Sequence, residues 1–238
     1  MKSLFLLTSA INTKFGVYTA DQRMEQMLDS IHSIRARVPD ARIMIFEMAG
    51  RPLTAEQLDT LTSQVDNILD FTGDDEVIGL YDSTDNWDVV KNVTEVMCFR
   101  KGVKALVDTE QLNDVDRIFK MSGRYTLTDD FDIKFYEEYR TQPNIVVAQR
   151  RTSQFPYAVT QVDAQFMSRL WSWPRPLTNE IMGVYDNILT FMYERLAAGG
   201  YCDIEHGLYQ FLDHNKIQEK ELVGITGNIG PNGAKVRD

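Results

Sequence analysis

The first 125 residues alternate short apolar runs with amphipathic segments of helical period. In the amphipathic stretch that begins near Asp21, Met27, Ile31 and Ile34 recur at the spacing of one helix face. Such an alternation is typical of a mainly parallel sheet flanked by helices. We therefore predict an α/β fold with a Rossmann-like sheet. The predicted strands are residues 4–7, "ARIMIFEMAG" (41–50), "VDNILDF" (65–71) and the stretch that starts "VDRIFKMSGR" (115–124).

The second half of the chain departs from this regular alternation. We find no long linker and no internal repeat, so we expect a single domain over residues 1–238 with a helical C-terminal part. Its two halves would span about residues 1–132 and 133–238. The predicted elements are short strands at "NIVVAQRR" (144–151) and "YAVTQ" (157–161), a break at "WSWPRP" (171–176), helices near 178–196 and 205–214, and a glycine-rich tail at 224–233.

The charge balance narrows the range of partners. A formal net charge of −10 argues against general affinity for nucleic acid or for anionic membranes. The two cysteines, Cys98 and Cys202, form neither a disulfide framework nor a metal knuckle, so we expect a reducing, cytoplasmic setting. No apolar run approaches the ~20 residues of a membrane helix, so we expect no membrane span.

The end of the fourth predicted strand carries an unusual set of side chains. Lys120 lies inside the apolar run, and Gly123 and Arg124 follow where the strand should end. Ligands of open α/β sheets bind beyond the carboxyl ends of the strands. Arginine offers a planar fork and lysine a compact charge, both suited to phosphate oxygens. The alternative is that Lys120 and Arg124 pair with neighbouring carboxylates.

Several segments resemble one known family when they are taken in order. "FLLTSAIN", "QRMEQMLDSIHSIRARVPDARIMIFEMAG", "IFKMSGRYTL", "DIEHGLYQFL" and "GITGNIGPNG" resemble segments of bacterial and viral glycosyltransferase-like proteins with the GT-A fold. In that family a Lys-x-Ser/Thr-Gly-Arg-Tyr run recurs at the fourth strand. The resemblance implies a transferase that moves a sugar from a nucleoside-diphosphate sugar to an acceptor hydroxyl, in glycan or polysaccharide synthesis. Residues 1–132 would then be the nucleotide-binding half and residues 133–238 the acceptor-side half.

One departure from GT-A enzymes concerns the metal. Those enzymes typically carry an Asp-x-Asp motif at the end of this strand, whereas this chain has Ser122-Gly123-Arg124. Arginine and lysine can neutralise a diphosphate directly, so we expect no metal ligands at this position. The nearby carboxylates Asp129, Asp130 and Asp132 leave Mn²⁺ or Mg²⁺ possible, although a solvated turn with a helix cap is the simpler interpretation.

The resemblance and the chemistry together give a set of candidate residues. Glu205 is a candidate general base, and His206 could bind phosphate or metal; alternatively, Asp203 caps a helix and Glu205 belongs to its first turn. Arg23 and Glu95 could face the site or solvent. The catalytic candidates are Arg124, Asp130 and Glu205. The substrate-binding candidates are Thr8, Ser9, Asn12, Arg23, Lys120, Gly123, Arg124, Tyr125 and His206.

Two further functions remain open from the sequence. A viral glycosyltransferase that modifies a DNA base would use the basic segments 100–104 and 149–151 for phosphate contacts. A non-catalytic nucleotide-binding protein of the same fold would account for the missing Asp-x-Asp motif. Trp171 and Trp173 could stack against an acceptor or pack in a hydrophobic corner.

Overall fold

The computed structural model describes residues 1–140, 142–229 and 233–238. The strands are β1 (Ser3–Ser9), β2 (Arg42–Glu47), β3 (Asn67–Asp70), β4 (Arg117–Ser122), β5 (Tyr125–Leu127), β6 (Ile145–Ala148), β7 (Arg151–Thr152), β8 (Ala164–Gln165), β9 (Leu170–Pro174), β10 (Ile217–Lys220), β11 (Ile225–Asn228) and β12 (Lys235–Arg237). The helices are α1 (Ala20–Arg37), α2 (Ala55–Thr62), α3 (Asp75–Ser83), α4 (Trp87–Asp108), α5 (Ile133–Glu138), α6 (Tyr157–Thr160), α7 (Thr178–Ala197) and α8 (Ile204–Phe211), with short 3₁₀ turns η1 (Arg175–Leu177) and η2 (His214–Lys216).

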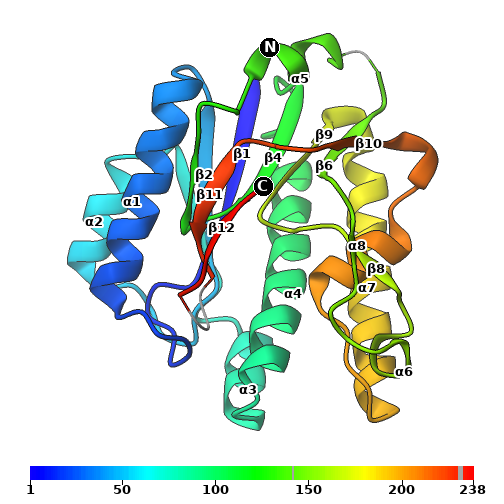
Figure 1. Ribbon diagram of the computed structural model, residues 1–238. Coiled ribbons are helices and arrows are strands. Elements are labelled where there is room, and N and C mark those ends of the chain that lie inside the picture. The colour runs from blue at the N-terminus through cyan, green and yellow to red at the C-terminus, as the bar shows by residue number, and fades with distance from the viewer. Residues whose placement is uncertain (141, 230–232) are drawn as a thin grey trace.

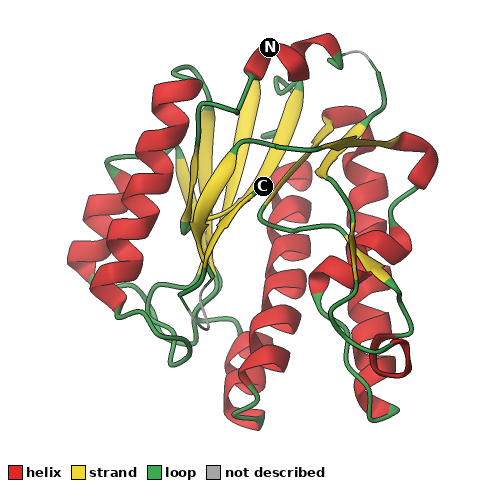
Figure 2. Ribbon diagram, viewed as in Figure 1, coloured by secondary structure: helices red, strands yellow, loops and turns green. Residues whose placement is uncertain are grey.

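A seven-stranded sheet with the order β10-β6-β9-β4-β1-β2-β3 forms the centre of the described chain. Strands β4, β1, β2 and β3 are parallel, and β9 runs antiparallel between β4 and β6. Helices flank this sheet on both sides (Figures 1 and 2). The structure therefore confirms the predicted α/β fold with a mainly parallel sheet.

Strand β1 shows why the sheet has two buried faces. Leu4 and Leu6 belong to the apolar cluster that includes α4 and α7, whereas Phe5 and Leu7 belong to the cluster that includes α1. Side chains alternate between the faces of a strand, so a continuous apolar run fills both layers. The carboxyl end of β1 consequently opens between α1 and α4.

Local capping chemistry sets the starts of several helices. Thr19 with Gln22, and Thr54 with Gln57, each form a reciprocal capping box at the starts of α1 and α2. Asp203 caps α8 by accepting a hydrogen bond from the backbone N–H three residues later. The predicted cap of that helix is therefore confirmed.

The predicted strand at 157–161 is wrong. These residues form helix α6 and its C-cap. Pro156 precedes the helix, and Gln161 ends it in the left-handed region, with φ 58°. Proline lacks a backbone N–H and is compatible with the start of a helix. The helix is a single turn, which is too short for helical periodicity to be visible in the sequence.

The predicted break at 171–176 is also wrong, because its first part is strand β9 in the middle of the sheet. Trp171 and Trp173 are 1% and 0% exposed and their ring centroids lie 4.7 Å apart. The packing alternative for the two tryptophans is therefore confirmed, and neither ring is available as an acceptor platform. Their large apolar surfaces instead fill the layer between the sheet and α7.

The glycine-rich tail contributes structure to the front of the molecule. Strand β11 pairs antiparallel with β5 and with β12, forming a small three-stranded sheet beside the carboxyl end of β4 (Figure 1). Part of the predicted tail, residues 230–232, lies outside the described residues. Helix α3 was not predicted. None of the helices in the described ranges is both long and apolar enough to cross a membrane.

Candidate functional site

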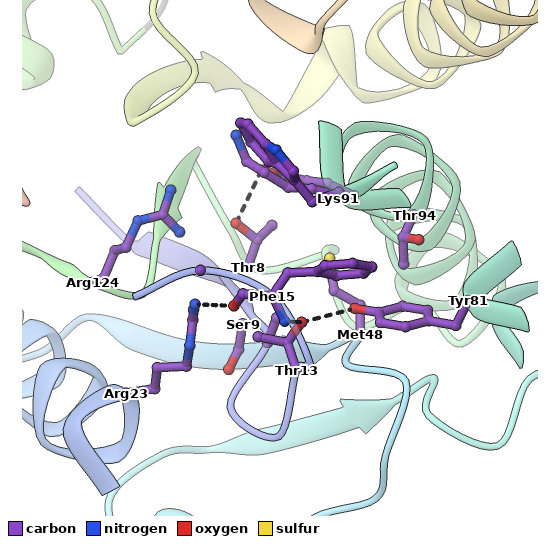
Figure 3. Close-up of a pocket in the computed structure, with 14 residues that line it drawn as sticks. Thr8, Ser9, Thr13, Phe15, Arg23, Met48, Tyr81, Lys91, Thr94 and Arg124 are labelled. Carbon is purple, nitrogen blue, oxygen red and sulfur yellow. Dashed lines mark hydrogen bonds between the residues drawn. The ribbon is translucent and has the colours of Figure 1, made fainter. Parts of the chain in front are cut away.

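A small cavity lies at the carboxyl ends of β1, β2 and β4, between α1 and α4. Its volume is about 80 Å³. Thr8 and Ser9 come from β1, Met48 follows β2, and Arg124 follows β4. This is the edge of an open α/β sheet at which ligands bind. We call it the smaller cavity (Figure 3).

Three cationic side chains line the smaller cavity. Arg23 comes from α1, Lys91 from α4 and Arg124 from the turn after β4. None of the three forms an ion pair with any residue that the structure describes. Arg23 only donates a hydrogen bond to the Phe15 carbonyl oxygen, at 2.9 Å. Burial and the neighbouring Arg124 lower the pKa of Arg23. An anion between these cations would remove that mutual repulsion.

Arg124 is the best placed of these cations. Its guanidinium carbon lies 5.3 Å from the centroid of the Tyr125 ring, and its Nε atom is buried without a hydrogen-bond partner in the described residues. A buried guanidinium N–H without an acceptor is costly unless a ligand supplies one. Tyr125 itself is 2% exposed. The buried ring therefore offers Arg124 a fixed cation–π contact.

Lys120 has a different environment from Arg124, although it lies only four residues earlier. It is 0% exposed, and its ammonium lies 2.5 Å from Glu95 Oε1, 3.0 Å from Ser122 Oγ and 2.8 Å from the Ser168 carbonyl oxygen. All three of its donors are used. The expected direct contact of Lys120 with phosphate does not fit this geometry, because the ammonium is enclosed by protein acceptors. The contacts match the alternative interpretation, in which Lys120 pairs with a carboxylate.

The other end of the smaller cavity is aromatic. Phe15 and Tyr81 lie with their ring centroids 5.9 Å apart, next to Met48 (Figure 3). Thr13 Oγ1 lies 3.5 Å from the Tyr81 hydroxyl. Thr94 has a buried hydroxyl with no hydrogen-bond partner in the described chain. This end offers apolar surface together with a few hydroxyl groups, which suits a planar polar ring.

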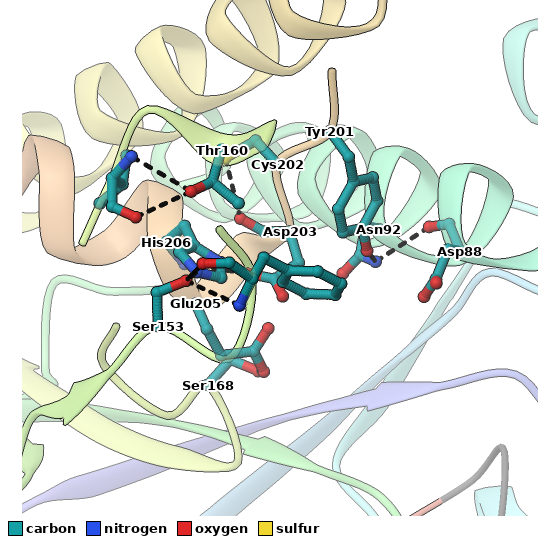
Figure 4. A network of polar contacts seen from close by, with 12 residues as sticks. Asp88, Asn92, Ser153, Thr160, Ser168, Tyr201, Cys202, Asp203, Glu205 and His206 are labelled. Carbon is teal, nitrogen blue, oxygen red and sulfur yellow. Dashed lines mark hydrogen bonds and ion pairs between the residues drawn. The ribbon is translucent and has the colours of Figure 1, made fainter. Parts of the chain in front are cut away.

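A larger cavity, of about 530 Å³, adjoins the smaller one. The two share the lining residues Trp87, Lys91, Glu95 and Arg124. Glu205 lines the larger cavity and accepts a hydrogen bond of 2.6 Å from Ser168 (Figure 4). The larger cavity extends between α4, α8 and the small sheet of β5, β11 and β12. Its volume is sufficient for a sugar-sized molecule.

His206 supports the wall of the larger cavity from behind. It is 0% exposed, with Nδ1 2.5 Å from Asp203 Oδ1 and Nε2 2.8 Å from Ser153 Oγ (Figure 4). Ser153 in turn donates to the Phe155 carbonyl oxygen and accepts from its N–H. Both ring nitrogens of His206 are therefore occupied, and the residue fastens the 153–155 loop to α8. The expected phosphate or metal contact does not fit this environment.

The acidic trio after β5 does not converge on a metal. Asp129 pairs with Arg37, Asp130 lies 2.5 Å from Arg237, and Asp132 caps α5. None of the three lines either cavity. In the described ranges we find no cluster of three His, Cys, Asp or Glu side chains that could hold a metal ion. The residues present therefore do not fit a divalent metal at this site, and the turn-and-cap interpretation of the trio matches the contacts.

The remaining predicted residues have varied positions. Asn12 hydrogen-bonds Gln57 and the Pro52 carbonyl oxygen, which holds the loop after β1 against α2. Gly123 lies where an added Cβ would meet Met27 and the Thr8 carbonyl oxygen. The glycine therefore lets the end of β4 approach α1 and β1 closely. The substrate contact expected of Gly123 stays a prediction.

A buried carboxylate underlies the loop after β1. Glu47 is 0% exposed and accepts hydrogen bonds from Ser9 Oγ and from the N–H groups of Ile11 and Ala49. Burial raises its pKa to about 7, against the lowering effect of these hydrogen bonds. The three contacts fix the path of the chain that forms the floor of the smaller cavity.

The structure adds Phe15, Tyr81, Lys91 and Thr94, which the sequence analysis did not select, and it places Glu95, which was left open between site and solvent, in the site. Lys91, Thr94 and Glu95 lie on the inward face of α4, while Phe15 and Tyr81 come from a loop and from α3. The three residues on α4 follow Trp87 at helical spacing, and this spacing was the available signal. The sequence around loop residues such as Phe15 offers no comparable signal.

Comparisons with known proteins bear on the fold. No family model matches the chain, and no curated protein matches it. Core-mannan synthase A (CmsA/Ktr4) from Aspergillus fumigatus, solved in a Mn/GDP form, is similar with a TM-score of 0.51 and 10% identity, over 98% of this chain and 77% of that chain. The mannosyltransferase Ktr4p from S. cerevisiae is similar with a TM-score of 0.55 and 10% identity, over 92% of this chain and 68% of that chain.

These likenesses concern the fold alone, because only one residue in ten is identical. They confirm the GT-A-like α/β fold that the resemblance implies. The smaller cavity at the carboxyl ends of the strands is the site that we assign to this fold.

Proposed function

We propose that the chain is a glycosyltransferase that uses a nucleoside-diphosphate sugar. The observation that carries this proposal is the convergence on one cavity of Arg23, Lys91 and Arg124, none of which forms an ion pair with a described residue, in a protein with net charge −10. Three cations that form no ion pair with any described residue, beside a small aromatic recess, match a nucleotide whose charge is concentrated in its diphosphate. The similar structures named above, a Mn/GDP form among them, support this class of donor.

In the proposed reaction the two cavities have separate roles. The diphosphate lies against Arg124 and Arg23, and the base and ribose lie towards Phe15 and Tyr81. The bond between the anomeric carbon and the diphosphate oxygen breaks, and its electron pair leaves with the diphosphate. An acceptor hydroxyl in the larger cavity attacks the anomeric carbon, and its proton passes to Glu205. The residues 1–132 would thus bind the donor and 133–238 would contribute most of the acceptor side.

Direct titration tests the donor class. UDP, GDP, TDP and CDP are titrated against the protein in EDTA by calorimetry, followed by assays of UDP-glucose and GDP-mannose hydrolysis. We expect one nucleoside diphosphate to bind well above the others and its sugar to be hydrolysed slowly. Failure of all four to bind would overturn the proposal. Binding without any turnover would favour the non-catalytic alternative, whereas hydrolysis that Glu205→Gln abolishes would exclude it.

The DNA-modifying alternative has less support from the surface charges. Every basic side chain of segments 100–104 and 149–151 forms an ion pair with a carboxylate. DNA phosphates would have to displace those carboxylates. Duplex binding that weakens steeply with salt would nevertheless establish that partner.

A further inference from the structure

Glu95 lies on the boundary between the two cavities. It comes from the inward face of α4, lines both cavities, and its side chain is 12% exposed. On one side of it lie the cations that we assign to the diphosphate, and on the other lies the cavity that we assign to the acceptor. A sugar that joins a bound diphosphate to an incoming acceptor must pass this position.

The surroundings of Glu95 keep its carboxylate ionised and fixed. Lys120 lies 2.5 Å from Oε1, and Thr8 donates a hydrogen bond to the same oxygen at 3.2 Å. Burial raises the pKa of Glu95, but Lys120, with help from Lys91 and Arg124, outweighs burial and lowers it. Oε2 has no hydrogen-bond partner among the described residues. One carboxylate oxygen is therefore anchored, and the other is available to a ligand.

Stability alone does not account for this ion pair. Removing two charges from water is costly, and a buried pair contributes little net stability compared with apolar residues of similar size. The ammonium of Lys120 nevertheless holds this carboxylate at the edge of the open space. Its two other hydrogen bonds, to Ser122 Oγ and the Ser168 carbonyl oxygen, fix Lys120 itself. A carboxylate held rigidly in a partly dry site is well suited to stabilise positive charge.

We propose that Glu95 is a catalytic residue that stabilises the positive charge developing on the anomeric carbon and ring oxygen of the donor sugar. This inference rests on the proposed function. As the bond to the diphosphate breaks, its electrons leave towards Arg23, Lys91 and Arg124, and the sugar becomes electron-poor. Glu95 then offers its negative charge to the sugar without forming a bond to it, while Glu205 accepts the proton of the acceptor. Lys120 acts as a positioning residue through Glu95.

The test separates catalysis from stability with two variants. Glu95→Gln keeps the shape but removes the charge, and leaves Lys120 without its partner. The double variant Glu95→Gln/Lys120→Met removes both charges, so its melting temperature should return close to that of the wild type. A matched control is Glu76→Gln, which removes an exposed carboxylate at the start of α3 that pairs with Lys101. Each protein is assayed for nucleoside-diphosphate affinity, and for the turnover number of donor hydrolysis with the sugar nucleotide that the wild type hydrolyses.

We expect both Glu95 variants to bind the nucleoside diphosphate within about threefold of the wild type, which is less than 1 kcal/mol. Their turnover should fall about 100-fold or more, even where the melting temperature is restored. A stable double variant with wild-type turnover would overturn the inference and leave the proposed function intact. A wild-type protein that binds no nucleoside diphosphate, or that hydrolyses no sugar nucleotide, would overturn the assigned activity together with this role of Glu95.

Discussion

The smaller and larger cavities share the wall of Trp87, Lys91, Glu95 and Arg124, but they differ in how their charges are satisfied. In the smaller cavity, Arg23, Lys91 and Arg124 face the open space and form no ion pair within the described part of the chain. In the larger cavity most charged groups are held by other groups of the protein. These pairs are Glu205 with Ser168, Asp203 with His206, and Arg151 and Arg169 with Asp238.

This difference predicts what each cavity can bind. A cavity with uncompensated charge gains most from a ligand of opposite charge, because the ligand removes repulsion and supplies missing hydrogen-bond acceptors. A cavity whose charges are already paired favours a ligand that exchanges hydrogen bonds without carrying charge. We therefore expect an anionic donor in the smaller cavity and a neutral, hydroxyl-bearing acceptor in the larger one.

The contrast between paired and unpaired cations is tested first at Lys120. Lys120→Met leaves Glu95 as a buried charge without its partner, so we expect a loss of about 3–5 kcal/mol in the free energy of unfolding. Lys104→Met breaks an exposed ion pair with Asp108 and should cost about 0–1 kcal/mol. Urea unfolding measures both variants. If both variants lost the same small free energy of unfolding, the ion pair of Lys120 with Glu95 would behave like an exposed pair, and the prediction would be wrong.

The second test concerns Glu47, which supports the floor of the smaller cavity. Its pKa in the folded protein is about 7, above its ordinary value of 4.5, so the folded state binds the proton more tightly. The stabilisation that the folded protein gains from a protonated Glu47 is complete below pH 4.5 and is lost as the pH rises through about 7. Glu47→Gln keeps the side-chain shape and does not titrate.

Unfolding measurements between about pH 5 and pH 8 compare wild type with Glu47→Gln. Across this range the wild type should lose on the order of 2–3 kcal/mol relative to the variant. The range avoids acid, where the lowered pKa values of Asp74 and Asp116 begin to matter. Parallel curves for the two proteins would show that Glu47 does not titrate in this range.

The third test concerns Arg124, the unpaired counterpart of Lys120. A guanidinium–phosphate contact in a partly desolvated cavity contributes about 1.5–3 kcal/mol, so Arg124→Ala should weaken nucleoside-diphosphate binding by about ten- to hundredfold. Arg124→Lys keeps the charge but loses the fork, and should still weaken binding about tenfold. The melting temperature should change little.

The matched control for Arg124 is Arg175→Ala, at the opposite edge of the sheet, beside the amino end of β4. This variant should bind nucleoside diphosphates like the wild type. An unstable Arg124→Ala protein with intact affinity would assign Arg124 to the scaffold rather than to the ligand.

Lys120 and Arg124 also show which features of the fold and the site can be predicted from the sequence alone. The alternation of apolar runs was enough to predict the sheet, because burial on both faces leaves a strong pattern over several residues. It also placed a charged cluster at the end of β4. The sequence could not tell which of the two cations was buried, because Glu95, the partner of Lys120, lies 25 residues away on α4. Such pairing depends on tertiary packing, which local sequence does not encode.

The same limit applies to strand β9 and to the candidates around it. The prolines near Trp171 and Trp173 suggested a break, but the first of them is the last residue of the strand. Asp130 was selected because three carboxylates lie close together in sequence. The fold directs two of them to separate arginines, Arg37 and Arg237, and this divergence is visible only in three dimensions.

The smallest expected effect concerns metal. Because the cations of the smaller cavity can neutralise a diphosphate by themselves, nucleoside-diphosphate affinity should be the same in EDTA and in Mn²⁺ or Mg²⁺. The double variant Asp129→Asn/Asp130→Asn should also bind unchanged, since these carboxylates pair with arginines outside both cavities. Asp132 is left intact because it caps α5. Calorimetry on the two proteins with and without chelator gives four affinities. Loss of binding in EDTA that Mn²⁺ restores would overturn the arginine-based account, and loss of that response in the double variant would locate the metal at the acidic turn.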